Sequence, residues 1–108
     1  MKIIHVITSL GDGGAENTLY KICKYDHSND HIVISLKEPK KYFSLINKLG
    51  IKVYCLNIKF FNFIFCFIKL INLIKVLKPD VVQTWLIHGD FIGGFAARIS
   101  GIKNIIWN

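Results

Sequence analysis

The sequence is poor in acidic residues and lacks the motifs that mark nucleic-acid binding. Its 108 residues carry 14 lysines and arginines against 7 aspartates and glutamates, a formal net charge of +7. Of the basic residues 13 are lysines, spread along the chain, and no aromatic-plus-basic RNA motif accompanies them. Scattered lysines indicate a solvated surface rather than a nucleic-acid interface. The charge also suits attraction to anionic lipid or to a phosphorylated substrate.

Cysteine is scarce and is not arranged as a metal site. Cys23, Cys55 and Cys66 lie in apolar runs without the spacing of metal ligands, so no metal is expected. An odd count without a secretory signal predicts reduced thiols in a cytoplasmic protein. The apolar N-terminus is interrupted by His5 and has no cleavage site, so it is predicted to be the first strand rather than a signal peptide. Repeats, linkers and low-complexity tracts are absent from the sequence as well.

What the sequence does contain is a glycine-rich turn at residues 10–16, after an apolar strand at 2–9 and before a helix. Glycines let the backbone approach a ligand, and helix N-terminal N–H groups face negative charge, so a phosphate site is predicted at this turn. A dinucleotide fingerprint would need glycine where Glu16 stands, and no Gly-Lys-Ser/Thr of a P-loop follows. Glu16 is favoured in the first helical turn by the helix dipole, whatever its function. The alternative is a tight turn without a ligand.

Strand and helix patterns alternate along the chain. Strands are predicted at 2–9, 31–36, 51–56, 80–84 and 103–107, and helices at 15–25, 39–49 (with Pro39 in the first turn and Gly50 as the cap), 60–77 and 91–100. Such alternation predicts an α/β fold with a doubly wound parallel sheet. Ligands of these sheets lie beyond the carboxyl ends of the strands, near the switch in strand order. Two loops are therefore expected to form the site, residues 10–15 and 85–90.

The second of these loops holds three candidate side chains. His88 is the predicted catalytic residue, because an imidazole in a strand-end loop can face the crevice and hydrogen-bond a substrate there. Its alternative is an ordinary structural or surface role. Asp90 is predicted to cap the next helix, with a catalytic base or a residue lining the substrate cleft as the alternatives. Trp85 is predicted to pack, with lining of the same cleft as its alternative. His5, within a strand, is predicted to be structural. No pair of carboxylates has the spacing of a catalytic acid and base.

Residues 60–68 are unusually apolar and rich in phenylalanine. The uninterrupted apolar span is too short to cross a bilayer, which needs about 20 residues. One interpretation is a crossover helix packed on the sheet with its extra bulk buried. The other is a helix resting on a membrane, with its apolar side inserted and its lysines among the headgroups. From the sequence we favour the first.

Residues 4–16, IHVITSLGDGGAE, resemble the start of a family 4 glycosyltransferase. Residues 79–90, PDVVQTWLIHGD, and 93–98, GGFAAR, resemble the same family's fourth strand and next helix. The resemblance implies one Rossmann-like half of a retaining GT-B enzyme, which uses nucleotide-diphosphate sugars without a metal or other cofactor. It implies that Gly13 and Gly14 approach the diphosphate and sugar of the donor, where backbone N–H groups stabilise the departing charge. Relatives place histidine on the fourth strand or just after it, whereas His88 comes later.

The family's donor domain, with its pair of donor-site glutamates and its basic donor-binding residues, has no counterpart in these residues. The last strand is apolar with no helix after it. We therefore expect residues 1–108 to be an N-terminal, acceptor-side domain, incomplete at its C-terminus and inactive without a donor domain, which a separate chain could supply. The expected reaction is sugar transfer from a nucleotide sugar to a saccharide or lipid-linked acceptor in surface polysaccharide, lipopolysaccharide or glycolipid synthesis. The expected location is the cytoplasm, and peripheral contact with an anionic membrane on its inner face is the alternative that the apolar helix leaves open. A non-catalytic fragment and another nucleotide-binding Rossmann module, such as a reductase, are the alternatives.

Overall fold

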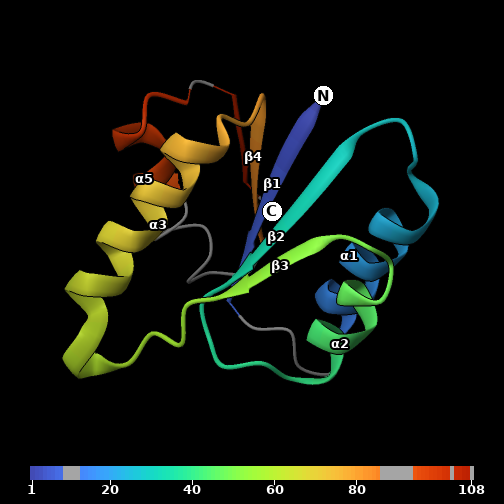
Figure 1. The fold of residues 1–108 in the computed structure, drawn as a ribbon, viewed down its shortest axis with the longest axis horizontal. Helices are drawn as coiled ribbons and strands as arrows, with labels where there is room; N and C mark the ends of the chain where they lie inside the picture. The colour runs from blue at the N-terminus through green and yellow to red at the C-terminus, as the bar shows by residue number, and fades with distance from the viewer. Residues whose placement is uncertain (9–12, 86–93, 103, 108) are drawn as a thin grey trace.

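The computed structural model describes residues 1–8, 13–85, 94–102 and 104–107, which form a sheet with helices on both faces (Figure 1). The elements in chain order are β1 (Lys2–Ile7), α1 (Gly14–Tyr25), β2 (Asp30–Ser35), α2 (Lys41–Asn47), β3 (Lys52–Cys55), the 3₁₀ turn η1 (Phe60–Asn62), α3 (Phe63–Leu77), β4 (Val81–Trp85), α5 (Gly94–Ile99) and β5 (Ile105–Trp107). The alternation of strands and helices predicted from the sequence is confirmed.

The sheet is parallel throughout, with the strand order β3-β2-β1-β4-β5. The chain runs outward from β1 through β2 to β3, then returns to the other side of β1 for β4 and β5. The strand order therefore switches between β1 and β4, as in a doubly wound Rossmann-like fold. Ile7 of β1 lies in register with Trp85 of β4, so the carboxyl ends of these two strands lie side by side.

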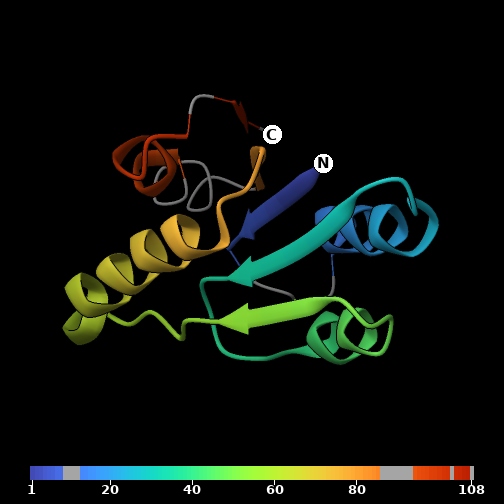
Figure 2. The same ribbon diagram turned by 45° about the horizontal axis from the view of Figure 1, so that its top comes forward.

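Both faces of the central strands are apolar because helices cover both (Figure 2). Helices α1 and α2 lie on one face, and α3 and α5 on the other. Alternate residues of β1 supply the two cores, with Ile7 on the α1 side and Ile4 and Val6 on the α3 side. The α1-side core comprises Ile7, Leu19, Cys23, Val33, Tyr42, Ile46 and Trp85.

Two helix ends follow the predicted glycine signals and one helix start does not. Gly50 and Gly101 have φ of +84° and +87°, the left-handed conformation that glycine adopts readily after a helix. The prediction that Pro39 lies in the first turn of the second helix is wrong. Lys40 is extended, with φ of −134° and ψ of −164°, so the helical conformation begins only at Lys41.

Helix α3 packs on the sheet through one stripe, which comprises Cys66, Leu70 and Ile74. The prediction that its extra apolar bulk is buried is wrong. A helix on one face of a sheet buries one stripe, and here apolar side chains also occupy the outer side. The exposed large apolar side chains of η1 and α3 are Phe61 (83%), Phe63 (43%), Ile64 (73%), Phe65 (81%), Ile68 (50%) and Val76 (76%). Within the described residues, no helix has both the length and the apolar character needed to cross a membrane.

Candidate functional site

The glycine turn lies at the end of the sheet toward which the strands point. β1 ends at Ile7, beside Trp85 of β4, and α1 begins at Gly14 (Figure 1). The start of α1 is therefore next to the switch in strand order, where ligands of doubly wound sheets bind. Residues 9–12 of the turn lie outside the described part of the chain.

The N-terminus of α1 presents backbone donors. Its first intrahelical hydrogen bond runs from the Asn17 N–H to the Gly13 carbonyl, over 3.1 Å. The N–H groups of residues 14–16 precede this bond and carry the partial positive charge of the helix end. Gly13 is the N-cap and has no side chain that could bond to them. This arrangement can accept an anion.

Gly13 and Gly14 differ in what surrounds them. Gly13 is extended, with φ of −153° and ψ of 178°, which any residue can adopt. A Cβ added there, however, would lie 2.9 Å from Oε2 of Glu16 and would push that carboxylate aside. A Cβ added at Gly14 would meet nothing within 4 Å. The predicted binding roles of the two glycines are untested by this geometry and stay predictions.

The Glu16 side chain folds back against the turn. It is 8% exposed, and both carboxylate oxygens lie against Gly13. Its place in the first turn of α1 is confirmed, and a carboxylate there is stabilised by the helix dipole. A diphosphate held by the same N–H groups would lie close to this negative charge. Glu16 therefore opposes anion binding unless its side chain turns away or a cation offsets its charge.

A chain of hydrogen bonds crosses the α1 side of the sheet from Trp85 to Asp26. Trp85 Nε1 lies 3.2 Å from His5 Nδ1, His5 Nε2 lies 2.9 Å from His31 Nδ1, and His31 Nε2 lies 2.9 Å from Asp26 Oδ2. An indole N–H can only donate, so His5 accepts at Nδ1 and carries its proton on Nε2. His5 then donates to His31, which donates from Nε2 to Asp26. The direction of every bond is thus set by the indole.

The electrostatics of this network favour a neutral His5 and a charged Asp26. Burial, with His31 adding to it, lowers the pKa of His5 to about 3. Hydrogen bonds from the Asn29 side chain, the Ser28 N–H and His31 lower the pKa of Asp26 to about 2. A neutral imidazole at His5 is the form that accepts from Trp85 and donates to His31.

The network explains the position of Trp85. Its side chain is 7% exposed, packs in the α1-side core, and uses its N–H on His5. Packing is thus observed, and lining of an acceptor cleft stays a prediction. Sequence reasoning treated His5 as structural but missed its partners. The available signal was the presence of His5 and His31 in otherwise apolar strands, with Asp26 in the polar segment before the second.

The predicted catalytic residue His88 and the predicted lining residue Asp90 lie in 86–93, outside the described residues. Their roles stay predictions. Among the residues that the structure describes, no three His, Cys, Asp or Glu side chains are grouped so that they could hold a metal ion.

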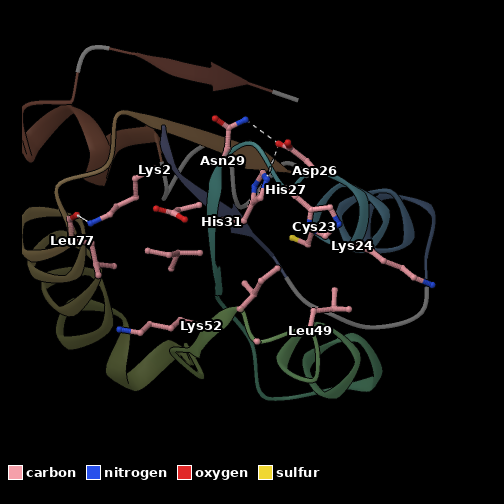
Figure 3. A pocket seen from close by; sticks show the side chains of 14 residues that line it. Lys2, Cys23, Lys24, Asp26, His27, Asn29, His31, Leu49, Lys52 and Leu77 are labelled. Atoms are coloured by element: carbon pink, nitrogen blue, oxygen red, sulfur yellow. Dashed lines mark hydrogen bonds and ion pairs between the residues drawn. The ribbon is translucent and has the colours of Figure 1, made fainter.

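A cavity of about 460 Å³ lies at the opposite end of the sheet, around the amino ends of β1, β2 and β3 (Figure 3). The bonded pair His31 and Asp26 lies on its wall. Lys2 donates from Nζ to the Leu77 carbonyl over 2.8 Å, and Figure 3 shows Lys24 directed away from the cavity. Because ligands of such sheets bind at the carboxyl ends of the strands, this cavity is not the candidate site.

The described fold is Rossmann-like and α/β, the arrangement of one half of a GT-B glycosyltransferase. No family model matches the chain, and no curated protein matches it in sequence. The similarity is therefore structural. It extends over nearly all of this chain but only part of each similar structure.

HepE of Anabaena, solved in complex with UDP, superposes with a TM-score of 0.78 over 99% of this chain at 19% identity. A second HepE structure, with UDP and glucose, gives 0.76 over 96% at 21% identity. MurG of Acinetobacter baumannii superposes with a TM-score of 0.78 over 98% of this chain at 16% identity. The apo form of the lipopolysaccharide outer core galactosyltransferase WaaB superposes with a TM-score of 0.67 over 99% of this chain at 18% identity. This chain spans 28–34% of the length of these structures. At such identities the likeness shows the fold.

Proposed function

We propose that this chain is the N-terminal, acceptor-side domain of a retaining family 4 glycosyltransferase. The observation that carries the proposal is the position of the α1 N-terminus at the switch between β1 and β4, in a fold shared with structures such as HepE. HepE was solved with UDP and with UDP and glucose, and WaaB is a galactosyltransferase. These ligands and this activity support a nucleotide-diphosphate sugar as the donor here.

In the proposed reaction, the glycine turn stabilises the leaving group. When the bond between the sugar and the nucleoside diphosphate breaks, negative charge grows on the diphosphate. Backbone N–H groups at Gly14 and the next two residues can stabilise this charge without moving. His88 would hydrogen-bond the sugar or the acceptor, with Trp85 and Asp90 along the acceptor cleft. The nucleotide sugar is a substrate, and the proposal uses no cofactor or metal.

Glu16 sets a condition on this proposal. Its carboxylate lies against Gly13, the N-cap of the helix whose N–H groups would bind the diphosphate. The family resemblance implies basic donor-binding residues in a second domain, which would offset the charge of Glu16. Binding of the donor by this chain alone is therefore expected to be weak, and strong binding is expected only with a donor domain present.

The proposal also includes a second domain, an acceptor and a cellular location. Because it spans about a third of the similar structures, we propose that transfer needs a C-terminal donor domain, from the same gene or a separate one. The proposed acceptor is a saccharide or a lipid-linked saccharide in the synthesis of surface polysaccharide, lipopolysaccharide or glycolipid. The proposed location is the cytoplasm, where nucleotide sugars are made.

The test is a pair of ligand titrations and one assay. Calorimetry should detect weak binding of UDP to the purified chain and no binding of NAD, which a reductase module would prefer. An assay with UDP-glucose and saccharide acceptors should show no turnover by the chain alone. Preferential binding of NAD would contradict the proposal, and turnover by the 108-residue chain would contradict the need for a second domain.

A further inference from the structure

The outer side of α3 carries an apolar ridge that no described element covers. The ridge consists of Phe61, Ile64, Phe65 and Ile68, each at least half exposed. It occupies η1 and the first two turns of α3, opposite the stripe by which the helix packs on the sheet. Isolated apolar side chains are ordinary on surfaces, whereas a contiguous group of this size indicates an interaction site.

The charge around the ridge is of one sign. Residues 39–79 contain eight lysines and no aspartate or glutamate. Lys59, Lys69 and Lys75 are exposed, and the first directly precedes η1. Lys69 follows Phe65 by four residues and Lys75 follows Ile68 by seven, so these lysines share the helix face of the ridge. Their stems can lie along apolar surface while their ammonium groups reach outward.

We propose that this ridge docks on the surface of an anionic lipid bilayer. Phe61, Phe65 and their neighbours enter the boundary between headgroups and acyl chains, and the lysines bind the lipid phosphates. A helix with an apolar outer face, flanking lysines and no carboxylates has the composition of interfacial helices. The uniform positive charge favours a uniformly negative surface such as an anionic bilayer. A surface that docks a protein usually carries acidic residues as well, which pair with basic residues of the partner.

A groove on the same face extends the ridge toward the end of α3. Its volume is about 460 Å³, and its lining includes Phe65, Ile68, Leu73 and Val76, with Lys69 among them. Apolar walls beside a lysine suit an acyl chain below a charged headgroup. The groove and the ridge together give the docked helix a continuous apolar contact along most of its length.

The docking geometry also concerns the candidate site. α3 begins at the end of the sheet where the strands end, which is also the end that carries the Gly13–Gly14 turn (Figure 1). A docked ridge would bring this end of the sheet near the lipid surface. A lipid-linked acceptor could then reach the site from the membrane. This consequence rests on the proposed function, whereas the docking itself does not.

The test is co-sedimentation of the purified chain with vesicles, in the absence of any nucleotide sugar. Binding to vesicles of phosphatidylcholine with phosphatidylserine is expected, with at least about tenfold weaker binding to phosphatidylcholine alone and a decrease as salt rises. Equal binding to both vesicle types, or no binding to either, would overturn the proposal. A loss of sugar transfer would not affect these readings, so the two proposals fail separately.

Matched variants distinguish binding through the ridge from nonspecific hydrophobic adsorption and from attraction by the net charge of the chain. Phe65→Ser is expected to weaken binding to anionic vesicles severalfold, whereas Tyr25→Ser, which removes an exposed aromatic from α1, is expected to leave it unchanged. Lys69→Glu with Lys75→Glu should abolish binding. Lys21→Glu with Lys24→Glu, an equal charge change on α1, should reduce it far less. Equal losses in the two members of either pair would overturn the assignment to α3.

Analytical sedimentation tests whether a second copy of the chain, rather than a lipid surface, covers the ridge. A dimer in solution that Phe65→Ser converts to a monomer would show that a second copy covers the ridge, and would overturn lipid docking. So would loss of vesicle binding on addition of a donor domain. Circular dichroism of each variant should match the parent, since all substituted side chains are exposed.

Discussion

His5 donates a hydrogen bond from Nε2 to Nδ1 of His31 over 2.9 Å, in the buried layer between the sheet and α1. Because Trp85 donates to the other nitrogen of His5, this imidazole must remain neutral for both bonds to persist. The core of the domain therefore contains a histidine that resists protonation. This arrangement has direct consequences for stability.

The first prediction concerns pH. Burial and His31 lower the pKa of His5 from 6.5 to about 3 in the folded state, so below pH 6.5 the unfolded chain binds a proton that the folded chain does not. Stability is therefore fully present above pH 6.5 and decreases as the pH falls toward 3. The limiting slope is about 1.4 kcal/mol per pH unit. Urea unfolding at a series of pH values measures it.

The control for this prediction removes the titrating group. His5→Gln should flatten the dependence between pH 6.5 and 4.5. This window lies above the range in which Asp26 affects stability, because the pKa of Asp26 is 3.8 in the unfolded chain and about 2 in the folded one. His27→Gln, at an exposed position, should leave the slope unchanged. Unfolding free energies that stay constant across this window in the parent chain would contradict the assignment.

The second prediction concerns the network as a structural unit. His5→Phe removes the acceptor for the Trp85 indole and the donor to His31, and leaves both groups buried without a partner. Each of the two groups costs about 1–3 kcal/mol, so the variant should lose roughly 2–6 kcal/mol of stability at neutral pH. Chemical denaturation measures the loss, with His27→Phe as the surface control. A loss below about 0.5 kcal/mol, the usual surface effect, would mean that the bonds contribute little.

The third prediction distinguishes the two glycines. Gly13→Ala would place a Cβ 2.9 Å from the Glu16 carboxylate, whereas Gly14→Ala meets no atom within 4 Å. We expect a loss of about 1 kcal/mol for the first, and for the second no loss or a gain of up to about 1 kcal/mol, because alanine favours helix. Adding Glu16→Ala should recover part of the Gly13→Ala loss in a double-mutant cycle. Additive effects would show that the carboxylate is not what restricts position 13.

The fold could be predicted from the sequence further than the site could. Apolar runs such as 3–7 and 80–84, with glycines past two helices, were sufficient for the elements, and alternation was sufficient for the parallel sheet. The prediction that Trp85 begins the loop after the fourth strand was wrong, because Trp85 is the last residue of β4. The start of α2 was predicted wrongly because proline is common both just before a helix and in its first turn, so Pro39 does not distinguish the two. Hydrophobic content alone did not show which side of α3 would face solvent.

The His5–His31 bond lay beyond sequence reasoning for a different reason. It depends on the register of β1 against β2, which places His5 opposite Val33 and Ile3 opposite His31. This diagonal relation between neighbouring strands brings the two rings together on one face. The fold-back of Glu16 onto Gly13 was likewise invisible, because the sequence places a residue in the first helical turn but does not set its side-chain rotamer.

The fourth prediction tests the influence of Glu16 on the proposed donor site. If a diphosphate binds the N–H groups at the start of α1, the nearby carboxylate repels it. Glu16→Gln should therefore bind UDP severalfold more tightly than the parent chain, and the difference should shrink as salt is raised. Calorimetry at low and high salt measures both effects. Glu38→Gln, at an exposed carboxylate outside the turn, should change nothing.

Amide chemical-shift mapping with UDP-glucose tests most directly whether the turn receives the diphosphate. The account predicts that titration of the ¹⁵N-labelled chain shifts the amides of Gly14, Ala15 and Glu16 most strongly, and that Glu16→Gln enlarges these shifts at equal ligand concentration. Shifts confined to the opposite end of the sheet, around His27 and Lys52, would contradict it. So would an unchanged spectrum at the start of α1.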